Sequence, residues 1–199
     1  MADRTDDTPD LPADVLAEVE EHARDVVHGG FTSLADAVAD VTDYFDDEGR
    51  VPPAAARAVV ERVWRERVAE QEGWPGTTDV DRLLSVFEDL EAGGVVARAD
   101  FTCCQTCGHA EIGDEAAEGA HGYVFFHRQD TEGAVHGGGV WLAFGSLVDG
   151  GDPVAADTAV AREVVEALTA GGLPVEWDGS VRTRVRVGPL DWRKRLPVG

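Results

Sequence analysis

Apolar residues recur at helical spacing from residue 11 to about residue 92, and glycine- or proline-rich stretches divide this region into four segments. Ser33 with Asp36, and Thr78 with Asp81, have the spacing of capping boxes at the starts of the second and fourth segments. Each segment is long enough for a short amphipathic helix, and the connections between the segments are brief. The pattern therefore predicts a compact bundle of four helices.

Strand-like apolar runs bounded by glycine replace the helical pattern after the fourth segment; they lie at residues 95–101, 123–127 and 140–144. A helix and then a hairpin across Asp178 and Gly179 are predicted further along, at residues 157–170, 174–177 and 181–187. With a short helix over residues 109–118, the element order becomes β-α-β-β-α-β-β. That order is the ferredoxin-like arrangement with one extra edge strand.

Four regions of different character follow from this pattern, and together they predict an α+β protein. They are a disordered N-terminus (1–10), a helical region (11–93), an α+β region (94–190) and a basic C-terminal tail (191–199). Because 43% of the residues are apolar and the carboxylates are spread along patterned helices, the chain is expected to fold around a core.

The charge balance is strongly acidic. The chain has 39 acidic and 17 basic residues, a net charge of -22, and Lys194 as its only lysine. Such a composition is typical of proteins that work in molar salt, where counterions screen the repulsion between carboxylates. We therefore expect a salt-adapted protein of a high-salt cytoplasm.

The sequence shows no sign of secretion or of a membrane partner. Residues 1–10 are polar and acidic, without the basic and apolar regions of a signal peptide. No apolar run approaches the roughly 20 residues that span a bilayer. The three cysteines crowd residues 103–107 instead of joining distant segments, which fits a reducing compartment. A cytoplasmic location is the expectation.

Three segments resemble those of an uncharacterised family of small prokaryotic proteins. They read FTCCQTCG at residues 101–108, FHRQDTE at residues 126–132 and GLPVEWDG at residues 172–179. The family is known only as a domain of unknown function, and the resemblance extends over most of the chain. It implies membership of that family and no particular activity.

The segment that holds the cysteines allows three kinds of chemistry. Cys104 and Cys107 have the spacing with which two thiolates bind one zinc ion. Cys103, His109 or His127 can supply a third ligand; His127 is favoured because a strand holds it. Cys103 is less suitable, because adjacent residues of an extended chain face opposite sides. The thiols can instead perform dithiol chemistry or pack together as small apolar groups, and the sequence leaves these alternatives open.

A thioredoxin-like arrangement is disfavoured, although a C-x-x-C motif at a helix start is its usual redox site. Residues 128–139 are interpreted as a short glycine-rich connection, where a thioredoxin-like fold needs a helix. This connection also lacks the proline that such sites place beside their cysteines.

A second polar cluster follows the strand predicted at residues 123–127. His127, Gln129, Asp130 and Glu132 leave the strand end together, where functional side chains are commonly presented. Their imidazole and carboxylate groups can serve as metal ligands or as a general acid and base. The alternative is a hairpin loop whose charges are solvated or bind one another.

Arg182, Arg184 and Arg186 alternate with valines, so a strand would place all three arginines on one face. With the basic residues 193–195 they can hold an anionic ligand or RNA, pair with the protein's own acidic helices, or protect a sheet edge. The acidic composition favours pairing within the protein. DNA binding is disfavoured, because the acidic side chains of the fourth helical segment would face the phosphates.

No phosphate-binding glycine loop, nucleophile elbow or H-E-x-x-H motif is present. The sequence therefore favours a binding or regulatory module with a protein or small-molecule partner. Its expected functional surface joins residues 103–109 to residues 127–132, with zinc as a candidate cofactor. The alternative is a thiol- or metal-dependent enzyme that uses the same residues.

Overall fold

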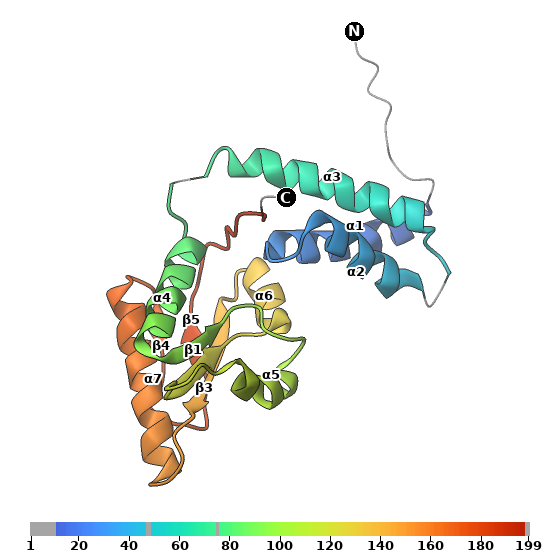
Figure 1. Cartoon of the computed structure of the whole chain (residues 1–199). Helices are drawn as coiled ribbons and strands as arrows, with labels where there is room; N and C mark the ends of the chain where they lie inside the picture. Colours follow the sequence, from blue (N-terminus) through green and yellow to red (C-terminus); the bar gives the residue numbers. More distant parts are fainter. Residues whose placement is uncertain (1–10, 47–48, 75, 198–199) are drawn as a thin grey trace. The chain divides into compact units, whose positions relative to one another are not determined.

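The computed structural model describes residues 11–46, 49–74 and 76–197, which form two compact units (Figure 1). One unit contains the described residues up to Trp74 together with residues 194–197, and the other is Gly76–Arg193. Within the described residues, strands occur in the second unit alone, and the protein is α+β as predicted. None of the helices described here is long and apolar enough to cross a bilayer. The expected disorder of residues 1–10 lies outside the described residues.

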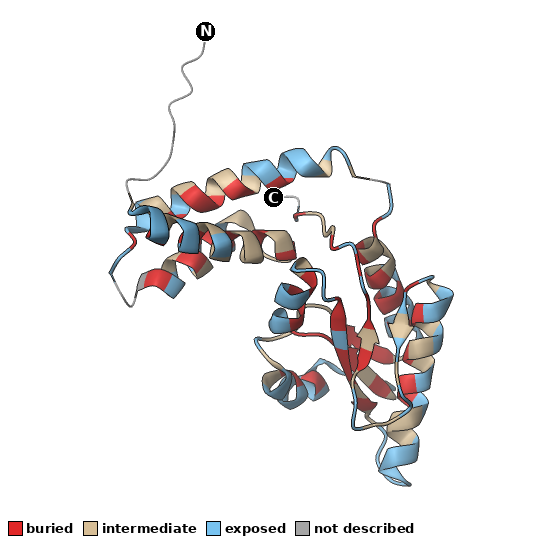
Figure 2. Cartoon of the chain, turned by 180° about the vertical axis from the view of Figure 1, so that it is seen from behind, coloured by how far each residue is buried: buried red, intermediate tan, exposed pale blue. Residues whose placement is uncertain are grey.

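Three helices make up the first unit, as their apolar periodicity predicted: α1 (Ala13–Gly29), α2 (Leu34–Asp46) and α3 (Pro53–Gln71). Their inward faces bring fully buried valines together, among them Val19, Val41 and Val60. The buried residues recur in bands along each helix in Figure 2. Half of the predicted capping box is present, because the Asp36 amide donates to Ser33 Oγ at 3.2 Å, and Ser33 Oγ donates in turn to Asp36 Oδ2 at 2.6 Å.

Residues 194–197, from the basic C-terminal tail, pack against the helices of the first unit. Leu196 is buried in the helical core, and its amide donates to Gln71 Oε1 at 2.7 Å. The Lys194 ammonium lies 5.1 Å from the centre of the Phe31 ring, within cation–π distance. Lys194 also packs against Gly30, whose left-handed φ of 82° ends α1.

The fourth predicted helix, α4 (Asp79–Gly93), belongs to the second unit, so the expected bundle of four helices is wrong. It packs on β1 (Val95–Arg98) and on α7 (Pro153–Ala170). Its predicted capping box is present: the Thr78 amide donates to Asp81 Oδ2 at 2.9 Å, and the Asp81 amide donates to Thr78 Oγ1 at 3.1 Å. Periodicity identified the apolar face of the helix but not the partner of that face.

The sheet of the second unit has the spatial order β1-β2-β3-β5-β4. Its other strands are β2 (Gly122–Phe125), β3 (Val140–Ser146), β4 (Val175–Glu176) and β5 (Val185–Val187). β1 pairs with β2 in parallel, and the other pairs are antiparallel. The ferredoxin-like order is not confirmed: it would separate the strands of the first β-α-β unit by another strand, whereas β1 and β2 are direct neighbours.

Two connections differ from the sequence-based prediction. The stretch expected to be a glycine-rich loop forms helix α6 (Arg128–Val135), which removes one of the two arguments against a thioredoxin-like arrangement. The short helix expected at residues 109–118 begins earlier, as α5 (Gln105–Glu111) followed by a 3₁₀ turn, η1 (Ile112–Glu115). Both helices are too short for apolar periodicity to reveal them.

The two faces of the sheet are covered differently. α4 and α7 lie on one face, and α7 approaches so closely that a Cβ on Gly122 would come within 2.6 Å of Val160 Cγ2. α5 lies on the other face, where a Cβ on Gly108 would come within 2.3 Å of Phe125 Cε2. The cysteine segment is thereby fixed to the face that α4 and α7 leave uncovered (Figures 1 and 2).

Candidate functional site

The loop between β1 and α5 has an unusual backbone. Asp100 and Thr102 have left-handed φ values of 52° and 59°, which non-glycine residues adopt rarely and at some cost. Hydrogen bonds hold this conformation: Thr131 Oγ1 donates to Asp100 Oδ1 at 2.6 Å, and the Arg128 amide donates to the Thr102 carbonyl at 3.2 Å. The start of α6 therefore fixes the loop that leads into the cysteines.

The three cysteines converge at the end of this loop. Their sulfur atoms all lie within 4.8 Å of one another, and Cys103 Sγ lies 3.6 Å from Cys107 Sγ. Cys103 was expected to point away from Cys104, but the chain is not extended throughout. The left-handed turn at Thr102 precedes the extended Cys104, and Thr102 Oγ1 donates to the Cys104 carbonyl at 3.1 Å.

The predicted histidine ligands do not lie with the sulfur atoms. Among the described residues, only one group of three or more histidine, cysteine or acidic side chains has its ligand atoms within 4.8 Å of one another. That group is the three thiols, and it contains no histidine. Cys103 is exposed, and Cys104 and Cys107 are half-buried. The thiols are therefore accessible and do not fill the protein core.

The cysteines differ in their acid–base properties. The pKa of Cys104 is lowered, first by the backbone N–H of Cys107 and then by hydrogen bonds from the thiols of Cys107 and Cys103. The pKa of Cys107 is raised to about 11, chiefly by its hydrogen bonds with Cys103 and Cys104. Of these two sulfurs, Cys104 therefore carries negative charge more readily than Cys107.

His109 points away from the sulfurs and packs on the sheet. Its Nδ1 lies 3.1 Å from the Tyr123 hydroxyl, and its Nε2 lies 3.3 Å from Gln105 Nε2. Burial, followed by the positive charge of Arg184, lowers the pKa of His109. These surroundings favour the neutral form of His109, and its contact with Tyr123 holds α5 against β2.

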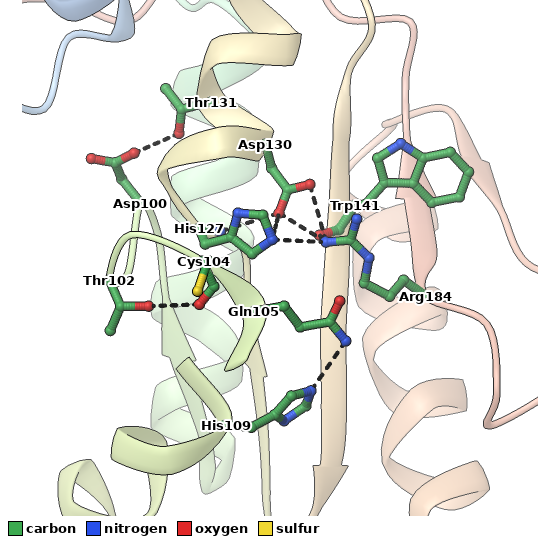
Figure 3. A network of polar contacts seen from close by, with 10 residues as sticks. All are labelled: Asp100, Thr102, Cys104, Gln105, His109, His127, Asp130, Thr131, Trp141 and Arg184. Carbon is green, nitrogen blue, oxygen red and sulfur yellow. Dashed lines mark hydrogen bonds and ion pairs between the residues drawn. The ribbon is translucent and has the colours of Figure 1, made fainter. Parts of the chain in front are cut away.

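Figure 3 shows a second polar group at the start of α6, in which the buried Asp130 carboxylate meets the guanidinium of Arg184. Arg184 Nη1 donates to Asp130 Oδ1 at 3.1 Å and to Oδ2 at 3.0 Å. His127 Nε2 lies 3.1 Å from Asp130 Oδ2 and 3.3 Å from Arg184 Nη1. Burial lowers the pKa of His127; Asp130 opposes this shift, and Arg184 adds to it.

The polar residues predicted around His127 have different surroundings. Asp130 faces inward, whereas Gln129 and Glu132 are exposed on α6. The helix explains this separation, because side chains on one helical turn point in different directions. The helix start carried a signal that was missed: Asp130 lies three residues after His127, and its Oδ2 accepts a hydrogen bond from the His127 amide at 3.2 Å.

The three arginines expected in one long strand do not share it: Arg184 lies directly before β5, and Arg186 lies within it. Arg182 lies in a turn and is exposed, because β5 begins only at Val185. Arg184 and Arg186 both lie near the Trp141 ring, with their guanidinium carbons 6.0 Å and 5.9 Å from its centre. Arg184 Nη1 also donates to the Trp141 carbonyl at 3.2 Å.

A pocket of about 560 Å³ lies beside these arginines, lined by Trp141, Trp177, Arg184 and Arg186 together with Glu176 and Asp178. Trp141 alternates with Ala143 along β3, and Ala143 pairs with Phe125. Side chains two residues apart share a face of the sheet, so Trp141 lies on the face that α5 covers at Phe125. The other lining residues lie within residues 175–186, the region of the predicted hairpin, where Arg184 and Arg186 were already candidates for anion binding. What the sequence could not predict is that Trp141, from a strand distant in the chain, lies beside them.

The comparisons with known proteins identify the family. The model of a family described as "Domain of unknown function (DUF6891)" matches residues 12–196. No curated protein and no solved structure shows significant similarity to the chain. The match extends over nearly the whole sequence, including the cysteine segment and α6. The chain belongs to this family of unknown function, as the resemblance implied.

Proposed function

We propose that the protein is a binding module that holds an organic anion on the sheet face beside the cysteine segment. The observation that supports this proposal best is the position of Arg184. Its guanidinium lines the pocket and is anchored by the buried carboxylate of Asp130. An arginine held in place in this way loses little side-chain entropy when it binds an anion.

The size and lining of the pocket support the same proposal. Small-molecule sites usually have volumes of roughly 300–1,000 Å³ and combine apolar walls with a few polar groups. Trp141 is 42% exposed, so its ring is accessible from solvent. A planar group of a ligand can stack on this ring while its carboxylate or phosphate reaches the guanidinium groups of Arg184 and Arg186.

The acidic groups of the pocket do not block an anion. Asp178 is occupied by its own turn, because the Ser180 amide donates to its Oδ1 at 2.9 Å. Glu176 pairs with Arg186 at 2.9 Å, but its side chain is 66% exposed. Exposed ion pairs contribute little free energy, so a ligand anion can displace Glu176 from Arg186.

The acidic composition supports the further proposal that this module works in molar salt. At that salt concentration exposed ion pairs are screened, whereas partly buried pairs are screened much less. The pair of Arg184 with Asp130 is of the second kind, because the Asp130 side chain is 4% exposed. The anchored arginine can therefore keep its orientation where surface ion pairs are weak.

A fluorescent aromatic anion, anilinonaphthalene sulfonate, tests the proposal in molar KCl. We expect Trp141→Ala and Arg186→Gln each to weaken binding of the probe by about 10-fold or more, which corresponds to about 1.4 kcal/mol. Tyr44→Ala and Arg182→Gln are controls, because each replaces an exposed side chain of the same kind outside this pocket. Both controls should bind the probe like the unmodified protein.

Equal probe affinity in the unmodified protein and in Trp141→Ala would contradict the proposed pocket. Circular dichroism of each variant shows whether it remains folded. This control matters because the probe also binds partly unfolded proteins. A loss of binding with an unchanged spectrum would support the proposal.

A thiol-dependent enzyme is the second candidate function, favoured by the contact between the sulfur atoms. Cys103 Sγ and Cys107 Sγ lie 3.6 Å apart, close enough to form a disulfide after a small movement. Alkylation followed by mass spectrometry separates the two candidates. One cysteine that reacts far faster than a free thiol would support an enzyme, and three slowly reacting thiols would support the binding module.

A further inference from the structure

We infer that Cys103, Cys104 and Cys107 together bind one thiophilic metal ion, with Zn²⁺ as the reference case, and leave one of its coordination positions open. The chain has three cysteines, and all three contribute a sulfur atom to this group. The inference goes beyond the anion pocket, whose residues it does not use. It also differs from the sequence-based expectation, in which a histidine completed a pair of cysteines.

The separations of the sulfur atoms suit a tetrahedral ion. Zinc–sulfur bonds of about 2.3 Å at tetrahedral angles place two sulfur ligands about 3.8 Å apart. Cys103 Sγ and Cys107 Sγ are 3.6 Å apart, and no pair in the group exceeds 4.8 Å. A movement of no more than about 1 Å at Cys104 would therefore complete the ligand set, which an adjustment of its side-chain torsion can provide.

The backbone around Cys104 is prepared for a thiolate ligand. The backbone N–H groups of Cys107 and Thr106 both hydrogen-bond Cys104 Sγ. Outer hydrogen bonds of this kind orient the ligands of metal sites. The loop before Cys104 is also fixed, because Thr102 donates to the Cys104 carbonyl and accepts from the Arg128 amide.

Two other uses of the cysteines explain less of the arrangement. A disulfide joins two sulfurs at about 2.05 Å and leaves the third thiol without a role. Core packing requires buried thiols, but Cys103 is exposed and the other two are half-buried. Only binding of a shared ion uses all three sulfur atoms at an accessible position.

The open position follows from the number of donors. Zinc sites with a purely structural role usually have four protein ligands, whereas sites with three keep a position for water or another ligand. Within the described part of the chain the group consists of three thiols and no fourth donor side chain. The bound ion would therefore accept an exogenous ligand, such as water or a small thiol.

Titration of the reduced, metal-free protein with Cd²⁺ tests the inference, because sulfur-to-cadmium charge transfer is visible in the ultraviolet. We expect one Cd²⁺ per chain, with an absorption amplitude that corresponds to three thiolates. The three serine variants Cys103→Ser, Cys104→Ser and Cys107→Ser should each weaken binding by at least about 100-fold. The loss of an outer-sphere hydrogen-bond partner already costs up to about 100-fold, and the loss of a direct ligand should cost at least as much. His109→Gln should bind Cd²⁺ like the unmodified protein.

Two outcomes would overturn the inference. If Cys103→Ser keeps full affinity, the site uses two cysteines; if His109→Gln loses affinity, a histidine is a ligand. Circular dichroism of the metal-free variants shows whether each is folded, and Zn²⁺ competition confirms that both ions occupy one site. Binding of the fluorescent anion is measured on the same variants. Because the pocket contains no cysteine, loss of metal binding and loss of anion binding are independent results.

Discussion

Replacement of Gly108 by alanine tests how the cysteine segment is fixed to the sheet. The new Cβ would lie 2.3 Å from Phe125 Cε2 and 2.6 Å from Phe125 Cζ, well inside ordinary van der Waals contact. The Phe125 ring is fully buried and has aromatic neighbours, with the Phe101 ring centre 5.9 Å away. The ring therefore has no space into which it can retreat, and α5 must move instead.

The expected net effect of Gly108→Ala is a loss of about 2 kcal/mol in the free energy of unfolding. Overpacking a core costs typically 1–3 kcal/mol, and a rigid buried ring favours the upper end, about 3 kcal/mol. Alanine returns up to about 1 kcal/mol through its higher helix propensity. Since Cys107 precedes Gly108, displacement of α5 should also weaken Cd²⁺ binding.

Urea unfolding in molar KCl, followed by tryptophan fluorescence, measures this effect. Gly113→Ala is the matched control, because no atom lies within 4 Å of the position of its Cβ. The control should be as stable as the unmodified protein or slightly more stable. If Gly108→Ala is as stable as Gly113→Ala and binds Cd²⁺ equally well, α5 does not pack on β2 as described.

Three further predictions concern charge. Asp130→Asn removes the carboxylate that binds Arg184 and should lower the free energy of unfolding by about 2 kcal/mol. The control Glu132→Gln changes an exposed side chain and should leave the free energy of unfolding unchanged, so equal urea midpoints for the two variants would contradict this prediction. Burial raises the pKa of Asp100 in the folded protein. The Asp100 carboxyl group therefore adds most to the free energy of unfolding below the ordinary aspartate pKa of about 3.9, and this stabilisation is lost as pH rises through the folded-state pKa. Asp100→Asn should therefore stabilise the protein at pH 7 by about 0.5 kcal/mol, with a smaller gain at acid pH; a gain that does not depend on pH would refute this. The melting temperature should fall when KCl is lowered from 1 M to 0.15 M, because the Debye length grows from about 3 Å to about 8 Å, and a flat or rising melting temperature would contradict salt adaptation.

Local sequence signals predicted the elements that local interactions determine. The helices of the first unit and α4 have clear apolar periodicity, the capping box at Thr78 is present in the structure, and Ser33 accepts the expected bond from the Asp36 amide. The order of the strands could not be predicted in the same way. It depends on which apolar faces meet, and the apolar residues of β1 and β2 do not specify their neighbours.

The candidate site was predicted in part, since the sequence identified the cysteine segment and the polar cluster after β2. It did not predict that Cys103 lies with Cys104 and Cys107, because that depends on the bend of the chain over residues 102–104. It also did not predict the pair of Arg184 with Asp130, which are 54 residues apart in sequence. Contacts over such separations come from tertiary folding and leave no periodic pattern in the sequence.

The most direct test of the three-cysteine site is alkylation mass spectrometry on protein purified without chelator. The extent of labelling is measured separately at Cys103, Cys104 and Cys107, before and after removal of metal. The account predicts that all three thiols are protected together and that all three become reactive when the metal is removed. Complete labelling of the three cysteines before the metal is removed would contradict a shared site. Protection of only two of the three cysteines would contradict it as well.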